Sequence, residues 1–122
     1  MPIGRHFYAG GPASVSVLEI VPAPGFCVLY SVEAQQLTAP PPGESRFLQI
    51  FDRPAAPVLG SVPLYSYLLG TNQLLAVQLP SPTDDQGRVI ATQAWAAWST
   101  TQATYTAAGA LGPITASGRH LR

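Results

Sequence analysis

Short apolar runs, each interrupted by proline or glycine, recur along the whole chain. The clearest is Arg-Phe-Leu-Gln-Ile-Phe-Asp at residues 46–52, which stops at Asp52 and is followed by Pro54 and Pro57. Because proline cannot donate a hydrogen bond to a sheet ladder, this pattern predicts a buried strand with an abrupt end. We expect residues 25–34 to form its partner strand.

Within residues 25–34, the alternate positions Phe26, Val28, Tyr30 and Val32 are all apolar or aromatic. Successive side chains of a strand point to opposite faces of its sheet, so this set is expected to face the core. The other set becomes more polar toward its end and is expected to face outward.

Further strands are predicted at residues 14–21, 62–67, 74–79 and 110–118, where apolar runs lie between turn-forming residues. The Gly-Thr-Asn-Gln sequence at residues 70–73 is a short turn signal. It suggests that the strands on either side of it pair as a hairpin.

Residues 88–101 allow two interpretations, because Trp95 and Trp98 are three positions apart and alanine is frequent around them. That spacing suits one face of a helix, whereas the Ser/Thr-rich run that follows favours a strand. We expect a strand.

About seven or eight short strands, spaced roughly ten residues apart and separated by Pro/Gly loops, predict an all-β fold. The expected architecture is a single β-sandwich or jelly-roll-like domain of antiparallel strands at residues 14–118. An extended N-terminal arm precedes it at residues 1–13, and a C-terminal tail follows at residues 119–122. The arm carries aliphatic and aromatic residues, so it would dock either on a neighbouring subunit or back on its own domain.

The charge balance narrows the class of partner. The 122 residues include six basic and six acidic ones, so the formal net charge is zero and only 10% of residues are charged. All basic residues are dispersed arginines, so the basic patch of a nucleic-acid-binding protein is missing. With 47% hydrophobic residues, the chain is expected to bury apolar surface against another protein in a permanent assembly. An ordinary monomer whose alanines inflate this percentage is the alternative.

Candidate chemistry is sparse. Cys27 is the single cysteine, so no disulfide can form within the chain, and it is expected to be a small core residue. His6 and His120 lie in the predicted terminal segments, and their spacing from Cys27 supports no nucleophile–base pair. The adjacent acids Asp84 and Asp85 fit a turn better than a calcium site. We therefore predict no catalytic residue, no cofactor and no metal site.

The sequence has no run of apolar residues long enough to span a bilayer and no standard secretion signal. A protein made in the cytoplasm, without membrane association, is expected. A competing hypothesis is a carbohydrate-binding module in which Trp95, Trp98, Tyr65 and Tyr67 form an exposed aromatic face. Exposed, coplanar tryptophan rings would support that hypothesis, whereas burial of both rings would remove its main basis.

Several stretches together resemble small virion proteins of tailed bacteriophages. Those proteins show a strand like Tyr-Leu-Arg-Leu-Tyr-Asp, then Ala-x-x-Pro-x-Gly-x-x-x-Pro, an apolar run, and a late strand with aromatic residues and Ser/Thr. The matching positions here are residues 47–52, 56–60 with Pro63, 74–79 and 94–101. The chain departs from the pattern at Gln49, where a basic residue is frequent, and at an inserted Pro-Pro-Pro at residues 40–42.

The resemblance spans residues 25–109 and implies a structural virion protein. The role it favours is a head decoration (cement) protein that binds the phage major capsid protein and stabilises its lattice, with tail, neck or baseplate components as alternatives. It also implies a homo-oligomer such as a trimer, assembled in the host cytoplasm and located on the capsid surface. The contact residues expected in the arm are Ile3, Arg5, Phe7 and Tyr8. On this view, deleting residues 1–11 weakens incorporation into particles and leaves the domain folded.

Overall fold

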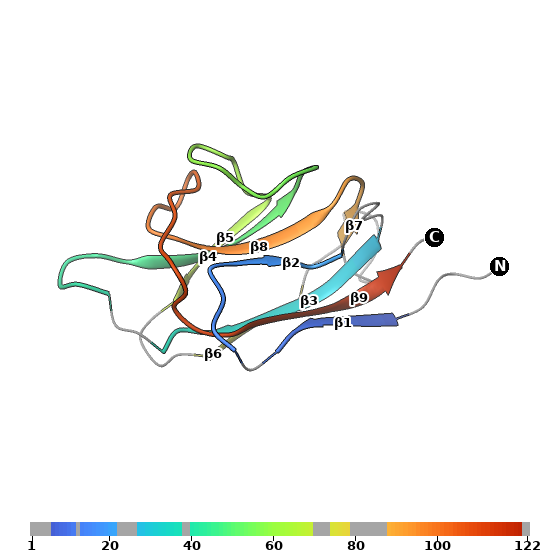
Figure 1. The fold of residues 1–122 in the computed structure, drawn as a ribbon, viewed down its shortest axis with the longest axis horizontal. Coiled ribbons are helices and arrows are strands. Elements are labelled where there is room, and N and C mark those ends of the chain that lie inside the picture. The colour runs from blue at the N-terminus through green and yellow to red at the C-terminus, as the bar shows by residue number, and fades with distance from the viewer. Residues whose placement is uncertain are drawn as a thin grey trace.

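The computed structural model describes residues 6–11, 13–21, 27–37, 40–69 and 88–120, together with the backbone of residues 74–78. These residues form nine strands in two antiparallel sheets that stack as two layers (Figure 1). The five-stranded sheet holds β1 (His6–Gly10), β9 (Ile114–His120), β3 (Cys27–Gln35), β6 (Leu74–Gln78) and β7 (Arg88–Ile90). The four-stranded sheet holds β2 (Val17–Glu19), β8 (Ala94–Ser99), β4 (Arg46–Asp52) and β5 (Tyr65–Leu69).

The order of the strands is that of a jelly roll. The larger sheet runs β1-β9-β3-β6, with β7 also paired to β3, and the smaller runs β2-β8-β4-β5. The chain thus behaves as one long hairpin whose tip lies between β4 and β5, and whose arms pair as β1 with β9, β2 with β8 and β3 with β6. This confirms the predicted all-β sandwich.

Two predicted strand pairings are wrong. Residues 25–34 do not pair with β4, since β3 lies in the larger sheet and β4 lies between β8 and β5 in the smaller one. The hairpin of residues 62–67 with 74–79 is wrong as well, because β5 pairs with β4 and β6 pairs with β3. Turn residues show where a strand ends. They do not show whether the next strand pairs with it as a hairpin or lies in the other sheet, because both connections use the same residue types.

The predicted core face of β3 holds for only part of the strand. A register shift between Leu29 and Ser31 inserts one extra residue, so the side-chain alternation changes phase there. Val32 faces the core as expected, but Tyr30 is only half-buried and lies against His6 on the other face. The residues of β3 that join the core are Cys27, Leu29, Val32 and Ala34.

The core lies between the two sheets and contains Trp98, which is completely buried. Residues 94–99 form strand β8, so the strand interpretation of the tryptophan segment is confirmed. A bend at residues 91–92 separates this strand from β7. The large apolar core side chains with no exposed surface are Leu29, Val32, Leu48, Ile50, Ile90, Trp98 and Ile114.

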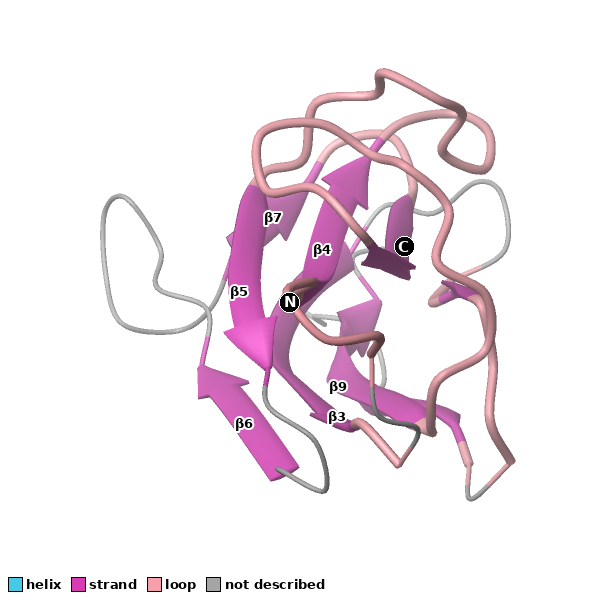
Figure 2. Ribbon diagram, turned by 90° about the vertical axis from the view of Figure 1, so that its left-hand side faces the viewer, coloured by secondary structure: helices cyan, strands magenta, loops and turns pink. Residues whose placement is uncertain are grey.

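The smaller sheet is covered on its outer face too. Phe51, Ala97 and Tyr105 form a second buried cluster there, with Val17 and Trp95 packed against it. The loops of residues 53–64 and 100–110 lie over this face, and Figure 2 shows loops arching above β4 and β5. Because β4 is buried on both faces, its sequence is a nearly continuous apolar run.

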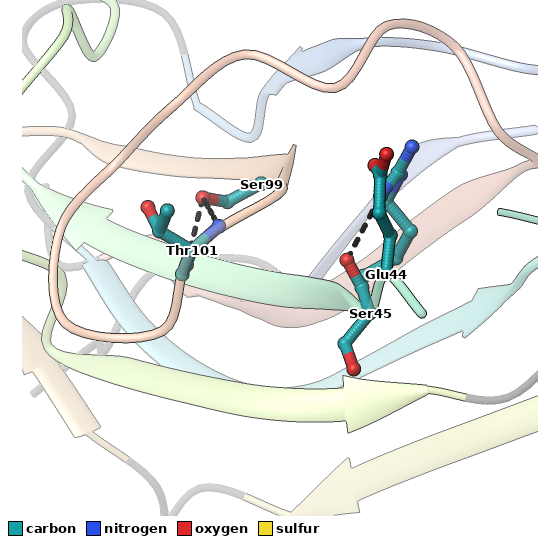
Figure 3. A network of polar contacts seen from close by, with 5 residues as sticks. Glu44, Ser45, Ser99 and Thr101 are labelled. Carbon is teal, nitrogen blue, oxygen red and sulfur yellow. Dashed lines mark hydrogen bonds and ion pairs between the residues drawn. The ribbon is translucent and has the colours of Figure 1, made fainter. Parts of the chain in front are cut away.

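Polar contacts hold the second loop in place. The Gln49 amide nitrogen lies 2.8, 3.0 and 3.2 Å from the carbonyl oxygens of Thr101, Gln102 and Thr104. The Ser99 hydroxyl donates to the Thr101 carbonyl at 2.8 Å and accepts from the Thr101 amide at 3.2 Å (Figure 3). Gln49 itself is fully buried, so the donor of these bonds is shielded from water.

The described part of the N-terminal segment lies on the chain's own domain. β1 pairs antiparallel with β9, and Phe7 stands directly opposite Gly118. A Cβ atom at Gly118 would come within 2.7 Å of the Phe7 ring, so the glycine leaves the space that this ring occupies. At the other end of the chain, β9 continues through His120. The described residues include no helix long and apolar enough to cross a membrane.

Candidate functional site

The four arm residues expected to contact a partner differ in where the structure places them. Ile3 and Arg5 lie outside the described residues. Phe7 is half-buried, packs against the core and has its ring centroid 5.0 Å from that of His120. Tyr8, the next residue, points outward and is 71% exposed. Of the described pair, Tyr8 therefore has the side chain that is free to meet a ligand or partner.

The tryptophans do not form an exposed sugar-binding face. Trp98 is completely buried, and its indole nitrogen donates to the Gly112 carbonyl at 3.3 Å. Trp95 is half-buried in the outer cluster of the smaller sheet and donates to the Arg53 carbonyl at 3.0 Å. Both rings serve packing, which removes the main basis of that version of the carbohydrate hypothesis.

Tyr65 and Tyr67 stack on each other along β5. Their ring centroids are 6.1 Å apart with 16° between the planes, and the Arg88 guanidinium lies 5.9 Å from the Tyr65 ring centre. Both rings are half-buried and pack against the core, and burial raises the pKa of Tyr67. This pair closes one edge of the sandwich.

The structure brings Cys27 and His120 together without making a nucleophile. They are directly opposed on β3 and β9. Burial raises the pKa of the Cys27 thiol to about 12, and the charge of Asp52 adds to the effect, so the thiolate is strongly disfavoured near neutral pH. In the described parts of the chain no three His, Cys, Asp or Glu side chains group as metal ligands. Asp84 and Asp85 lie outside those parts.

Most of the described acids are engaged in holding the fold. The Asp52 carboxylate accepts from the backbone amides of Ala91, Thr92 and Gln93 at 2.9, 2.9 and 3.2 Å. Glu44 accepts from Arg46 at 3.1 Å. Similarly, Glu19 accepts from the Gln93 side chain at 2.5 Å. Glu33 is exposed, as Glu19 and Glu44 are, and it lies on the outer face of the larger sheet.

An exposed apolar turn is the first surface feature that sequence reasoning missed. It comprises residues 58–62, in which Val58, Leu59 and Val62 are 60%, 80% and 76% exposed. The Ser61 amide donates to the Val58 carbonyl at 2.9 Å, and Gly60 has φ of 91°. Glycine at the third position with positive φ is the requirement of a type II turn. The Gly-Ser pair after Val-Leu was the available sequence signal.

Hydrogen bonds to neighbouring segments fix this apolar turn. The Gly60 amide donates to the Tyr105 carbonyl at 2.9 Å, and the Tyr105 amide donates back to the Ser61 carbonyl at 2.8 Å. The Ser61 hydroxyl accepts from the Val58 amide at 3.0 Å and also from the Arg53 guanidinium. Three large apolar side chains are thus presented to solvent on a backbone that is already ordered.

A hollow of about 530 Å³ on the larger sheet is the second feature. Strands β1, β9 and β3 form its floor, and its polar and aromatic lining comes from Tyr8, Glu33, Gln35 and Thr115. Apolar or backbone surface comes from Gly11, Ala34, Leu37 and Pro113. The hollow could not be predicted from the sequence without knowing that β9 lies between β1 and β3. β9 is more than a hundred positions away from β1 in the sequence.

Comparison with known proteins gave no match: no family model, no curated protein and no solved structure resembles this chain closely enough to be counted.

Proposed function

We propose that this chain is a structural subunit of a tailed-bacteriophage virion, and that it acts as a head decoration protein bound to the major capsid protein lattice. The virion part of the proposal comes from the resemblance of residues 25–109 to small phage structural proteins. The binding part is carried by one observation, the exposed and pre-ordered apolar turn at residues 58–62.

An exposed apolar turn costs free energy in water, because apolar surface is stabilised by about 25 cal/mol for each Å² removed from solvent. Covering it with a partner recovers that free energy. Since hydrogen bonds to Tyr105 already order the turn, binding does not have to fix the backbone first. Leu59, the most exposed large apolar side chain of the turn, would insert into an apolar socket of the partner.

Low charge supports a permanent assembly. With a formal net charge of zero, neighbouring copies on a lattice repel one another little. Many copies also multiply a modest binding free energy per copy into a large stabilisation of a shell. A decoration role therefore needs no single tight interface.

The proposal is tested by counting copies in particles. Virions encoded by the genome that carries this chain are purified on a density gradient, and the chain is quantified by mass spectrometry against the major capsid protein. Hundreds of copies are expected. A handful would place the chain in the neck or baseplate, and its absence from particles would refute a virion role.

The turn is tested in a rebinding assay. Particles that lack the chain are mixed with purified wild-type protein or variants and sedimented. Leu59→Asp should lower the affinity by at least about tenfold. Val89→Asp places the same charge at a 49%-exposed apolar position on β7 and should bind normally. If both variants bound equally well, the turn would not be part of the interface.

A further inference from the structure

The hollow on the larger sheet is a built feature of the β1–β9–β3 surface. Thr115 of β9 is paired with Gly10 on one side and with Glu33 on the other. Gly10 has φ of 95°, and a Cβ atom there would collide with the Ile114 carbonyl oxygen, so this position accepts only glycine. In the row of paired residues Gly10, Thr115 and Glu33, the β1 position therefore carries no side chain. This leaves space at β1 beside the exposed Tyr8.

The neighbouring glycine, Gly11, lines the hollow and borders open space. A Cβ atom at Gly11 would meet no atom within 4 Å, although Gly11 lines the hollow. A larger side chain at this position would project into free space instead of into the sheet. Gly11 therefore adds no side chain to the hollow that it lines.

The lining combines an apolar wall with hydrogen-bonding groups. Tyr8 is 71% exposed and Leu37 is 49% exposed, and each offers apolar surface to a bound molecule. Glu33 adds carboxylate oxygens, Gln35 an amide and Thr115 a hydroxyl. Such a site fits a ligand that has one apolar face and several hydroxyl groups.

Other ligand classes fit less well. An anion would meet the Glu33 carboxylate, and the described lining residues include no arginine to balance it. A divalent cation needs several oxygen ligands, whereas the described lining holds one carboxylate. A wholly apolar ligand would cover Glu33, Gln35 and Thr115 without satisfying their hydrogen bonds. The volume lies within the range of about 300–1,000 Å³ found for small-molecule sites.

We propose that this hollow binds an uncharged saccharide. The Tyr8 ring packs on the apolar C–H face of a sugar ring, and sugar hydroxyls donate to Glu33 and exchange hydrogen bonds with Gln35 and Thr115. The negative charge of Glu33 disfavours acidic sugars. This site uses different residues from the aromatic face expected from the sequence, in which Trp98 is buried and Trp95, Tyr65 and Tyr67 are half-buried.

The location permits saccharide binding while the chain is docked elsewhere. The hollow lies on the larger sheet, whereas the loop that carries the apolar turn lies beyond the smaller sheet, in the opposite layer (Figure 1). A subunit held on an assembly through the turn would therefore still present the hollow to solvent. The inference stands apart from the proposed function, because it concerns the isolated chain.

The experiment titrates the purified chain with cello-, malto-, N-acetylchito- and galacto-oligosaccharides by isothermal titration calorimetry. Oligogalacturonate serves as the acidic probe. At least one neutral oligosaccharide should bind with a Kd below about 1 mM, and the acidic probe should bind at least about tenfold more weakly. Absence of binding by all four neutral series, or equal binding of the acidic probe, would overturn the proposal.

Three variants locate the binding. Tyr8→Ala and Glu33→Gln should each weaken the neutral oligosaccharide by about tenfold, and Gly11→Leu should abolish binding by filling the hollow. Leu59→Ala, which removes an exposed side chain on the other layer, is the matched control and should bind normally. Urea unfolding midpoints near that of the wild type show that the variants are folded. Unchanged affinity in Tyr8→Ala and Gly11→Leu would place any observed binding outside the hollow.

Discussion

Gln49 shows how much one buried amide organises. A fully buried glutamine in the centre of a strand is unusual, and here its amide nitrogen serves three carbonyl oxygens of the covering loop together with the Ser66 hydroxyl at 3.2 Å. From the sequence it was a departure from a family pattern. In the structure it anchors the loop that covers β4 and β8.

Replacing Gln49 by leucine keeps the approximate size and removes both amide protons. The loop carbonyls then lose their donor, and we expect the free energy of unfolding to fall by about 2–4 kcal/mol. Ser66→Ala, which removes only one of the four acceptors, should cost less than about 1 kcal/mol. Urea unfolding followed by tryptophan fluorescence measures both. If Gln49→Leu lowered the free energy of unfolding no more than Ser66→Ala, water would be supplying the hydrogen bonds to the loop carbonyls in place of the amide.

At the scale of elements, Asp52 joins the end of β4 to the bend before β8. Its carboxylate accepts three successive backbone amides, from Ala91 to Gln93, so one side chain completes a segment that no sheet ladder pairs. The sequence showed Asp52 as the residue that ends a strand. Its role in holding a distant bend depends on a contact 39 to 41 positions away.

Asp52→Ala should lower the free energy of unfolding by about 1–3 kcal/mol, because three backbone amides, those of the exposed Ala91 and Thr92 and the buried Gln93, lose a charged acceptor. Hydrogen exchange should also become faster at Ala91, Thr92 and Gln93 before the rest of the protein opens. Glu44→Gln, which alters an ion pair whose carboxylate side is 53% exposed, is the control and should change stability by less than about 1 kcal/mol. Uniform acceleration of exchange throughout the chain would contradict a local role.

The elements themselves were largely predictable, because local composition decides where a strand stops. Residues 46–52 were predicted and observed with the same bounds, as β4. The face of β3 was not predictable, because a single extra residue near Tyr30 changes the alternation and leaves no mark in the hydrophobic pattern. Neither was the loop at residues 100–107, whose Ser/Thr-rich composition favours a strand but whose backbone bonds to Gln49 and Ser99.

For the whole molecule, the long-hairpin topology limits how much of the structure can be predicted from the sequence. Sandwich class follows from strand number and spacing, but the pairing of β1 with β9 joins segments at opposite ends of the chain. The candidate surfaces depend on that closure. Tyr8 was singled out from the sequence for its aromatic ring in an arm, and in the structure it lines the hollow. Glu33, Gln35 and Thr115 were not recognised, because they meet only through the pairing of β3 with β9.

The same closure changes the expected effect of removing the N-terminal segment. Deleting residues 1–11 was expected to leave the domain folded, but it removes edge strand β1 and takes the Phe7 ring away from the core. The free energy of unfolding should therefore fall. If this truncated chain bound particles or a ligand less well, the lower stability of the domain and the loss of contact residues could both be the cause.

Two neighbouring substitutions in β1 separate these effects. Phe7→Ala should destabilise the protein by about 2 kcal/mol, less than for a fully buried phenylalanine because the ring is half-buried. Tyr8→Ala, at a 71%-exposed position of the same strand, should change stability by no more than about 0.5 kcal/mol. Urea unfolding curves of the two variants, recorded together, test the alternation directly. Equal losses would mean that β1 packs differently in solution, whereas a stable Tyr8→Ala protein provides the variant with which contacts of this strand can be examined on a folded domain.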